Sequence, residues 1–110
     1  MTAAAQGRLA LPSDAPEASE RTVELAEASG FRVEQILSGR LDVPQDYEQE
    51  HDEWVVLLAG TAVLEVDGDE HHLGPGDWWL LPAGTPHRLL HTEPRTSWLA
   101  VRSNGHRERA

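Results

Sequence analysis

The segment of residues 74–87 constrains the fold of this chain more strongly than any other part of its sequence. It begins with Gly-Pro-Gly-Asp, continues with the apolar run Trp78–Leu81, and ends with Pro-Ala-Gly-Thr-Pro before His87. Glycine and proline supply turn geometry, and Pro82 has no N–H to donate to a ladder of strand hydrogen bonds. We therefore predict a turn, a strand over residues 78–81 that is buried on both faces, and a second turn that leads into a strand carrying His87.

Turn residues divide most of the remaining chain into short segments with strand character. Ser29-Gly30 separates the first two of these segments, and residues 39–48 are typical of a loop. Asp67-Gly68 favours the positive φ angles of a two-residue hairpin turn. The candidate strands are residues 23–26, 31–37, 61–66, 70–73, 86–90 and 97–101. Because no helical period of useful length accompanies them, the pattern predicts an all-β fold, an antiparallel jelly-roll barrel.

Length and composition limit the classes of function that this chain can have. Its 110 residues allow one domain, which we divide into a flexible N-terminal arm (1–20), a barrel (21–103) and a polar C-terminal tail (104–110). A net charge of −10 repels phosphate backbones and anionic lipids, so we expect neither nucleic acid nor a membrane as a partner. The chain has no cysteine and no lysine, which excludes thiol catalysis, disulfides and lysine Schiff bases.

The sequence also bears on where the protein acts. Residues 1–11 lack an apolar stretch of the length found in signal peptides. The longest mostly apolar run, residues 54–64, is interrupted by Gly60 and is shorter than the roughly 20 residues of a spanning helix. We therefore expect a cytoplasmic protein.

Four residues within the segment 74–87 form a pattern that resembles a known sequence motif. Glycine, five residues, proline, one residue, glycine, two residues and histidine is similar to the second motif of the cupin superfamily; here these residues are Gly76, Pro82, Gly84 and His87. Glu53 and Gly60 stand at the spacing of the first cupin motif. The chain thus resembles a small single-domain cupin, and the resemblance implies a barrel whose interior holds the functional site.

The first motif is incomplete in this sequence. The resemblance implies that Glu53 and His87 are metal ligands, but the two histidine positions of the first motif fall on Tyr47 and Gln49. These two residues are weaker ligands for soft metals than imidazole, and we expect them to line a substrate pocket. The asparagine that usually ends the second motif is His91.

Strand parity suggests a displaced metal site. If residues 47–53 form one extended strand, His51 and Glu53 share a face, and His87 shares a face with His91 in the same way. With both strands lining the barrel, as in cupins, the predicted metal ligands are His51, Glu53, His87 and His91. Such a set suits Zn, Fe, Mn, Ni or Cu. The alternatives are that His51 lies in solvent near the barrel mouth, that His91 has a structural role, and that no metal binds.

Two classes of function follow from these observations. The first is a metal-dependent enzyme that acts on a small polar molecule, and the second is a metal-free module that binds a sugar or another metabolite without catalysis. The chain contains no Gly-x-Ser-x-Gly elbow, so a serine hydrolase is not indicated. Trp78 and Trp79 are adjacent and face opposite sides of their strand, and residues 54–58 are apolar on both faces. We therefore expect a second subunit to cover the outer sheet, which makes a homodimer.

Overall fold

The computed structural model of the protein describes residues 3–47 and 49–103, which form nine strands and one short 3-10 helix. The predicted tail 104–110 lies outside the described residues. The elements are η1 (Pro12–Asp14), β1 (Glu20–Ala28), β2 (Phe31–Ser38), β3 (Gln45–Tyr47), β4 (Glu53–Ala59), β5 (Ala62–Val66), β6 (Asp69–Leu73), β7 (Trp78–Leu81), β8 (His87–Thr92) and β9 (Thr96–Ser103). Of the described residues, none forms a helix with the length and apolarity that crossing a membrane requires.

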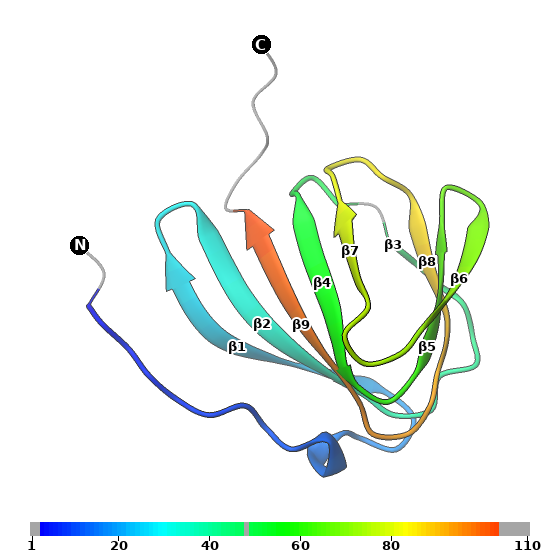
Figure 1. The fold of residues 1–110 in the computed structure, drawn as a ribbon, viewed down its shortest axis with the longest axis horizontal. Coiled ribbons are helices and arrows are strands. Elements are labelled where there is room, and N and C mark those ends of the chain that lie inside the picture. Colours follow the sequence, from blue (N-terminus) through cyan, green and yellow to red (C-terminus); the bar gives the residue numbers. More distant parts are fainter. Residues whose placement is uncertain (1–2, 48, 104–110) are drawn as a thin grey trace.

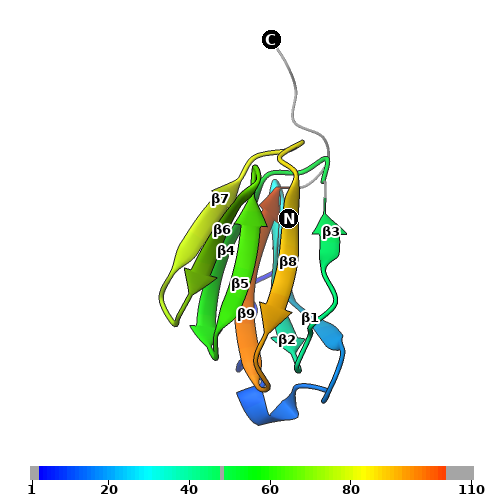
Figure 2. The ribbon, with the colours of Figure 1, turned by 90° about the vertical axis from the view of Figure 1, so that its right-hand side faces the viewer.

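The strands make two antiparallel sheets that face one another. The larger sheet has the order β1-β2-β9-β4-β7, and these strands lie side by side in Figure 1. The smaller sheet has the order β3-β8-β5-β6. In Figure 2 this sheet faces the viewer, with β3 at its edge. Each sheet has one hairpin pair at an edge, β1 with β2 and β5 with β6, and its other pairs, such as β2 with β9, join strands that do not follow one another in the chain. This arrangement confirms the predicted all-β jelly-roll barrel.

Each predicted strand is present, and the predicted hairpin turn has the expected geometry. Asp67 and Gly68 both have positive φ, 50° and 88°, which matches the twist of a two-residue hairpin and joins β5 to β6. The buried interior comes from period-two alternation: in β4, Val55 and Leu57 are buried and their neighbours are more exposed. Leu64 of β5 and Leu89 of β8 pack in the same core from the opposite sheet.

Two local predictions differ from the structure. Residues 47–53 are not one strand, because β3 ends at Tyr47, inside the predicted loop, and β4 begins only at Glu53. Strand β7 is buried on its inner face alone: Leu81 is 3% exposed, whereas Trp78 is 60% and Leu80 55% exposed on the outer face. Strand β7 is the edge strand of its sheet, and no segment within residues 3–47 and 49–103 covers its outer side chains Trp78 and Leu80.

The arm before β1 is held to the barrel by backbone hydrogen bonds from Gly39 and Arg40 to the carbonyls of Ser19 and Glu17 and, nearer its start, by one side chain. The amide of Gln35, which is 1% exposed, accepts a hydrogen bond from the Ala10 N–H (2.8 Å) and donates one to the Ala10 carbonyl (3.0 Å). The same Nε2 also donates to Ser97 Oγ on β9 at 3.0 Å. The arm therefore lies against the outer face of β2 and β9 at this point.

Candidate functional site

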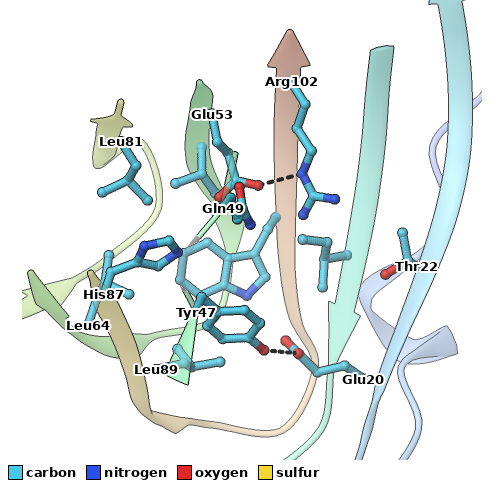
Figure 3. Close-up of a pocket in the computed structure, with 13 residues that line it drawn as sticks. Glu20, Thr22, Tyr47, Gln49, Glu53, Leu64, Leu81, His87, Leu89 and Arg102 are labelled. Carbon is cyan, nitrogen blue, oxygen red and sulfur yellow. Dashed lines mark hydrogen bonds and ion pairs between the residues drawn. The ribbon is translucent and has the colours of Figure 1, made fainter. Parts of the chain in front are cut away.

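A cavity of about 130 Å³ lies between the two sheets. Figure 3 shows the side chains that surround it, which come from β1, β2, β4, β5, β7, β8 and β9 and from the segment that includes Tyr47 and Gln49. Its polar lining residues are Glu20, Thr22, Tyr47, Gln49, Glu53, His87 and Arg102, and Trp98 lies among the apolar ones. The cavity is lined by both residues of the predicted substrate pocket, Tyr47 and Gln49, and by two of the four predicted metal ligands, Glu53 and His87.

His87 is held in one orientation at the start of β8. Its Nδ1 lies 3.0 Å from the carbonyl oxygen of Thr85, which can only accept, so Nδ1 carries the proton and donates. When the ring is uncharged, this tautomer leaves Nε2 as an acceptor. Tyr47 is directly opposite His87 in the β3–β8 pair, and the two rings stack with centroids 5.5 Å apart at 15°.

The hydroxyl of Tyr47 is tied to an acidic residue of β1. It donates to Glu20 Oε1 at 3.0 Å, and Glu20 Oε2 accepts from Ser38 Oγ at 2.8 Å. Burial, and then the nearby Glu20 carboxylate, raise the pKa of the phenol well above its usual value, because both disfavour a phenolate. Tyr47 is therefore a neutral hydrogen-bonding group at physiological pH.

Glu53 is paired with an arginine that the sequence did not single out. The two residues are opposite one another in the β4–β9 pair, and Arg102 Nε donates to Glu53 Oε2 at 2.6 Å. Arg102 Nη1 lies 2.8 Å from Glu34 Oε1 on β2, so one guanidinium bridges two carboxylates. The alternation of Trp98, Ala100 and Arg102 along β9 could have indicated that Arg102 faces inward, but its partners depend on strand register.

Two further polar groups at the cavity have no hydrogen-bond partner in the described part of the chain. They are Gln49 Oε1, an acceptor, and Trp98 Nε1, a donor, and both atoms are buried. A buried polar atom without a partner is costly, so such atoms in a cavity wall point to a ligand that supplies the partner.

The other two predicted ligands do not line the cavity. Leu90 is an extra residue in β8, since Val63 pairs with His91 while Leu64 pairs with Leu89. This bulge reverses the parity after Leu89 and turns His91 outward, where its Nδ1 donates to Asp42 Oδ1 at 2.7 Å.

The position of His51 has a different cause. It lies between β3 and β4, in the segment where the predicted continuous strand is interrupted. Strand parity therefore does not carry its side chain to the face that Glu53 occupies, and His51 is not among the lining residues.

The residues of the cavity do not fit the predicted metal centre. Catalytic zinc sites use three protein ligands from histidine, carboxylate or thiolate. This cavity has one imidazole, that of His87, and its two carboxylates already accept hydrogen bonds, Glu20 from Tyr47 and Ser38 and Glu53 from Arg102. Throughout residues 3–47 and 49–103, no three such side chains gather to hold a metal ion.

Comparisons with known proteins agree with this architecture. Residues 32–102 match the sequence model of a family described as Cupin domain. A solved structure of a candidate mannose-6-phosphate isomerase from Ralstonia eutropha JMP134 is 32% identical, with a TM-score of 0.77, over 91% of this chain and 100% of that one. KdgF from a Halomonas species is 20% identical, with a TM-score of 0.69, over 80% and 81% of the two chains. No curated protein matches the sequence.

Proposed function

This protein belongs to the cupin domain family, and from that premise we propose that its barrel binds a small, hydroxyl-rich metabolite such as a monosaccharide without a metal ion. The observation that carries the proposal is the pair of buried, unpaired polar atoms at the cavity, which are Gln49 Oε1, an acceptor, and Trp98 Nε1, a donor. In the uncharged ring of His87, Nε2 is a further acceptor. A hydroxyl group both donates and accepts, so a molecule with several hydroxyls satisfies all of them.

The size of the cavity supports a small ligand. Its volume of about 130 Å³ lies below the roughly 300–1,000 Å³ of sites for drug-sized molecules. Its wall combines polar atoms with the apolar side chains of Val55, Leu64 and Leu81. Such a wall matches a sugar ring, which has hydroxyls around its rim and C–H groups on its faces.

The similar protein from Ralstonia eutropha adds independent support. Its name refers to a reaction of a sugar, and at 32% identity over 91% of this chain the two share more than a fold. We therefore place the ligand of this chain among sugars and related polyols. A reaction on that ligand is a separate question, and the metal-dependent enzyme stays a prediction that the same experiment tests.

The experiment measures binding of hexoses by calorimetry and by the melting temperature, in buffer treated with chelator. A ligand at 100 times its Kd stabilises the native state by about 2.7 kcal/mol. We expect one or more hexoses to raise the melting temperature, and we expect Gln49→Leu to remove that effect. Gln6→Leu is the matched control, because Gln6 is exposed on the arm.

The outcomes separate the two classes of function. If no hexose binds, the proposal is wrong. If only divalent ions, added to chelator-free buffer, raise the melting temperature, and His87→Gln abolishes the effect, the metal-dependent alternative replaces it. A hexose effect that survives in Gln49→Leu would also contradict the proposed binding site.

A further inference from the structure

We infer that the ligand of this cavity carries a protonated primary amine, as an amino sugar does; this inference rests on the proposed function and names the chemical class of its ligand. The evidence is the arrangement of acceptors and the balance of charge around the cavity. The balance of charge is the feature that distinguishes such a ligand from a neutral sugar.

Three residues that line the cavity carry acceptors. Glu53 accepts from Arg102 through Oε2, which leaves Oε1 as the second oxygen of that carboxylate. Gln49 Oε1 is buried and unpaired, and His87 presents Nε2 because Nδ1 donates to the Thr85 carbonyl. Gln49, Glu53 and His87 all line this cavity, and in Figure 3 His87 points into it from the sheet opposite to that of Glu53.

This set of acceptors matches an ammonium group. A primary ammonium has three N–H donors and no acceptor, so it can donate to a carboxylate, an amide oxygen and an imidazole nitrogen at once. It needs only hydrogen bonds, which leave the pair between Arg102 and Glu53 intact. A metal ion would instead need direct bonds to both Glu53 and His87.

The charges around the cavity favour a cation over an anion. Two carboxylates line it, Glu20 and Glu53, and Arg102 is the single cation in the lining. Arg102 uses Nε for Glu53 and Nη1 for Glu34, so two carboxylates compensate its charge. Arg32 is opposite Arg102 in the β2–β9 pair.

The net charge of the ionised residues at and beside the cavity decides whether it prefers a cationic or an anionic ligand. Glu20, Glu34 and Glu53 outnumber Arg32 and Arg102, within a chain of net charge −10. A ligand with a phosphate or carboxylate group would meet this negative field, whereas an ammonium group is attracted by it. We therefore expect affinity to fall from the amino sugar to the neutral sugar to the sugar phosphate.

The experiment compares matched ligands on the wild-type protein at neutral pH in chelator-treated buffer. The panel is glucose, galactose and mannose, their 2-amino derivatives, the N-acetylated forms of these amines, and the 6-phosphates. For the hexose that fits best, we expect the amine to bind about tenfold more tightly than the parent, a modest share of the attraction between charges about 4 Å apart. The N-acetylated form keeps the nitrogen but not the charge, and we expect it to lose the gain.

A variant assigns the effect to the carboxylate. In Glu53→Gln, we expect the ratio of amine to parent affinity to fall to about one, whereas Glu70→Gln, on an exposed position of β6, should keep the wild-type ratio. The wild-type panel alone is decisive if Glu53→Gln does not fold. Equal affinity for amine and parent, or tightest binding of the phosphate, overturns this inference and leaves the proposed function standing. If no member binds, the proposed function fails, and the inference fails with it.

Discussion

Replacing Arg102 by methionine tests whether the bridge between β2, β4 and β9 stabilises the barrel. The side chain of Arg102 is 21% exposed, and those of its partners Glu53 and Glu34 are 7% and 13% exposed. Methionine keeps the unbranched apolar stem but removes the guanidinium. The variant Arg102→Met thus leaves two largely buried carboxylates close together with no cation between them.

The expected loss in the free energy of unfolding follows from the distances and the burial of the ion pairs that Arg102 makes. Two charges about 4 Å apart interact by about 4 kcal/mol at an effective dielectric constant of about 20, and removing one partner of a buried pair costs about 3–5 kcal/mol. Because a fifth of the Arg102 side chain contacts solvent, screening reduces these values. We therefore expect Arg102→Met to lower the free energy of unfolding by about 2–4 kcal/mol.

Urea unfolding followed by tryptophan fluorescence measures this loss. With a slope of about 2 kcal/mol/M, in the middle of the usual range, the midpoint should fall by about 1–2 M. The double variant Arg102→Met/Glu53→Gln should recover at least half of the loss, because it removes one unpaired charge. Arg88→Met is the control: Arg88 Nε also lies 2.6 Å from a carboxylate, that of Asp46, but this pair is on the surface, and we expect little change.

Two results would refute the reasoning. One is a loss in Arg102→Met no larger than that in Arg88→Met, since the two pairs share the same separation and differ in burial. The other is a double variant that is no more stable than Arg102→Met. In either case the bridge would not stabilise the barrel through its charge.

Three further predictions concern other parts of the molecule. Tyr47 is the one tyrosine of the chain, and its pKa is raised in the folded protein. Its contribution to the free energy of unfolding is complete below the unfolded pKa of about 10 and should decline at higher pH. An absorbance titration in which the folded protein shows a tyrosine pKa of about 10 would contradict this. Gly60 and Gly76 both have positive φ, but a Cβ at Gly60 would lie 2.7 Å from Thr96 Cα, whereas one at Gly76 would meet nothing. We therefore expect Gly76→Ala to lower the free energy of unfolding by about 1–2 kcal/mol and Gly60→Ala to lower it more. Equal losses in urea unfolding would contradict the overlap at Gly60. Trp78 is 60% exposed, as expected for a residue that a second subunit covers in the predicted homodimer. Sedimentation should therefore show a dimer, and Trp78→Glu should weaken it. A wild-type protein that is a monomer at micromolar concentration would contradict the predicted homodimer.

The sequence predicted the strands well because their signals are local. Alternation marks residues 31–37 as a strand, and the preference of Asp67-Gly68 for positive φ specifies the hairpin without reference to the rest of the chain. The glycines and prolines of residues 74–87 likewise limit β7 to four residues and open β8 at His87. Each of these features is set by residues within a few positions of one another.

The site was less predictable because it depends on register and on interruptions of parity. One extra residue, Leu90, turns His91 away from the face of His87, and the break before β4 does the same for His51. The partners Glu20 and Arg102 come from strands far from the motif residues in sequence, and pairing between strands is what brings them to the cavity. Neither a bulge nor a register is visible in the spacing of residues alone.

The side chain of Gln35 has a consequence for how the protein melts. Its amide pairs with both polar groups of Ala10 in the way that one peptide group pairs with another, so it extends the hydrogen-bond ladder to a segment that has no strand of its own. Detaching the arm would break both bonds to Ala10, each worth about 0.5–1.5 kcal/mol net, while Nε2 would keep its bond to Ser97 Oγ. Residues around position 10 should therefore be released together with the barrel, in one cooperative transition, and amide hydrogen exchange at Ala10 should be slow.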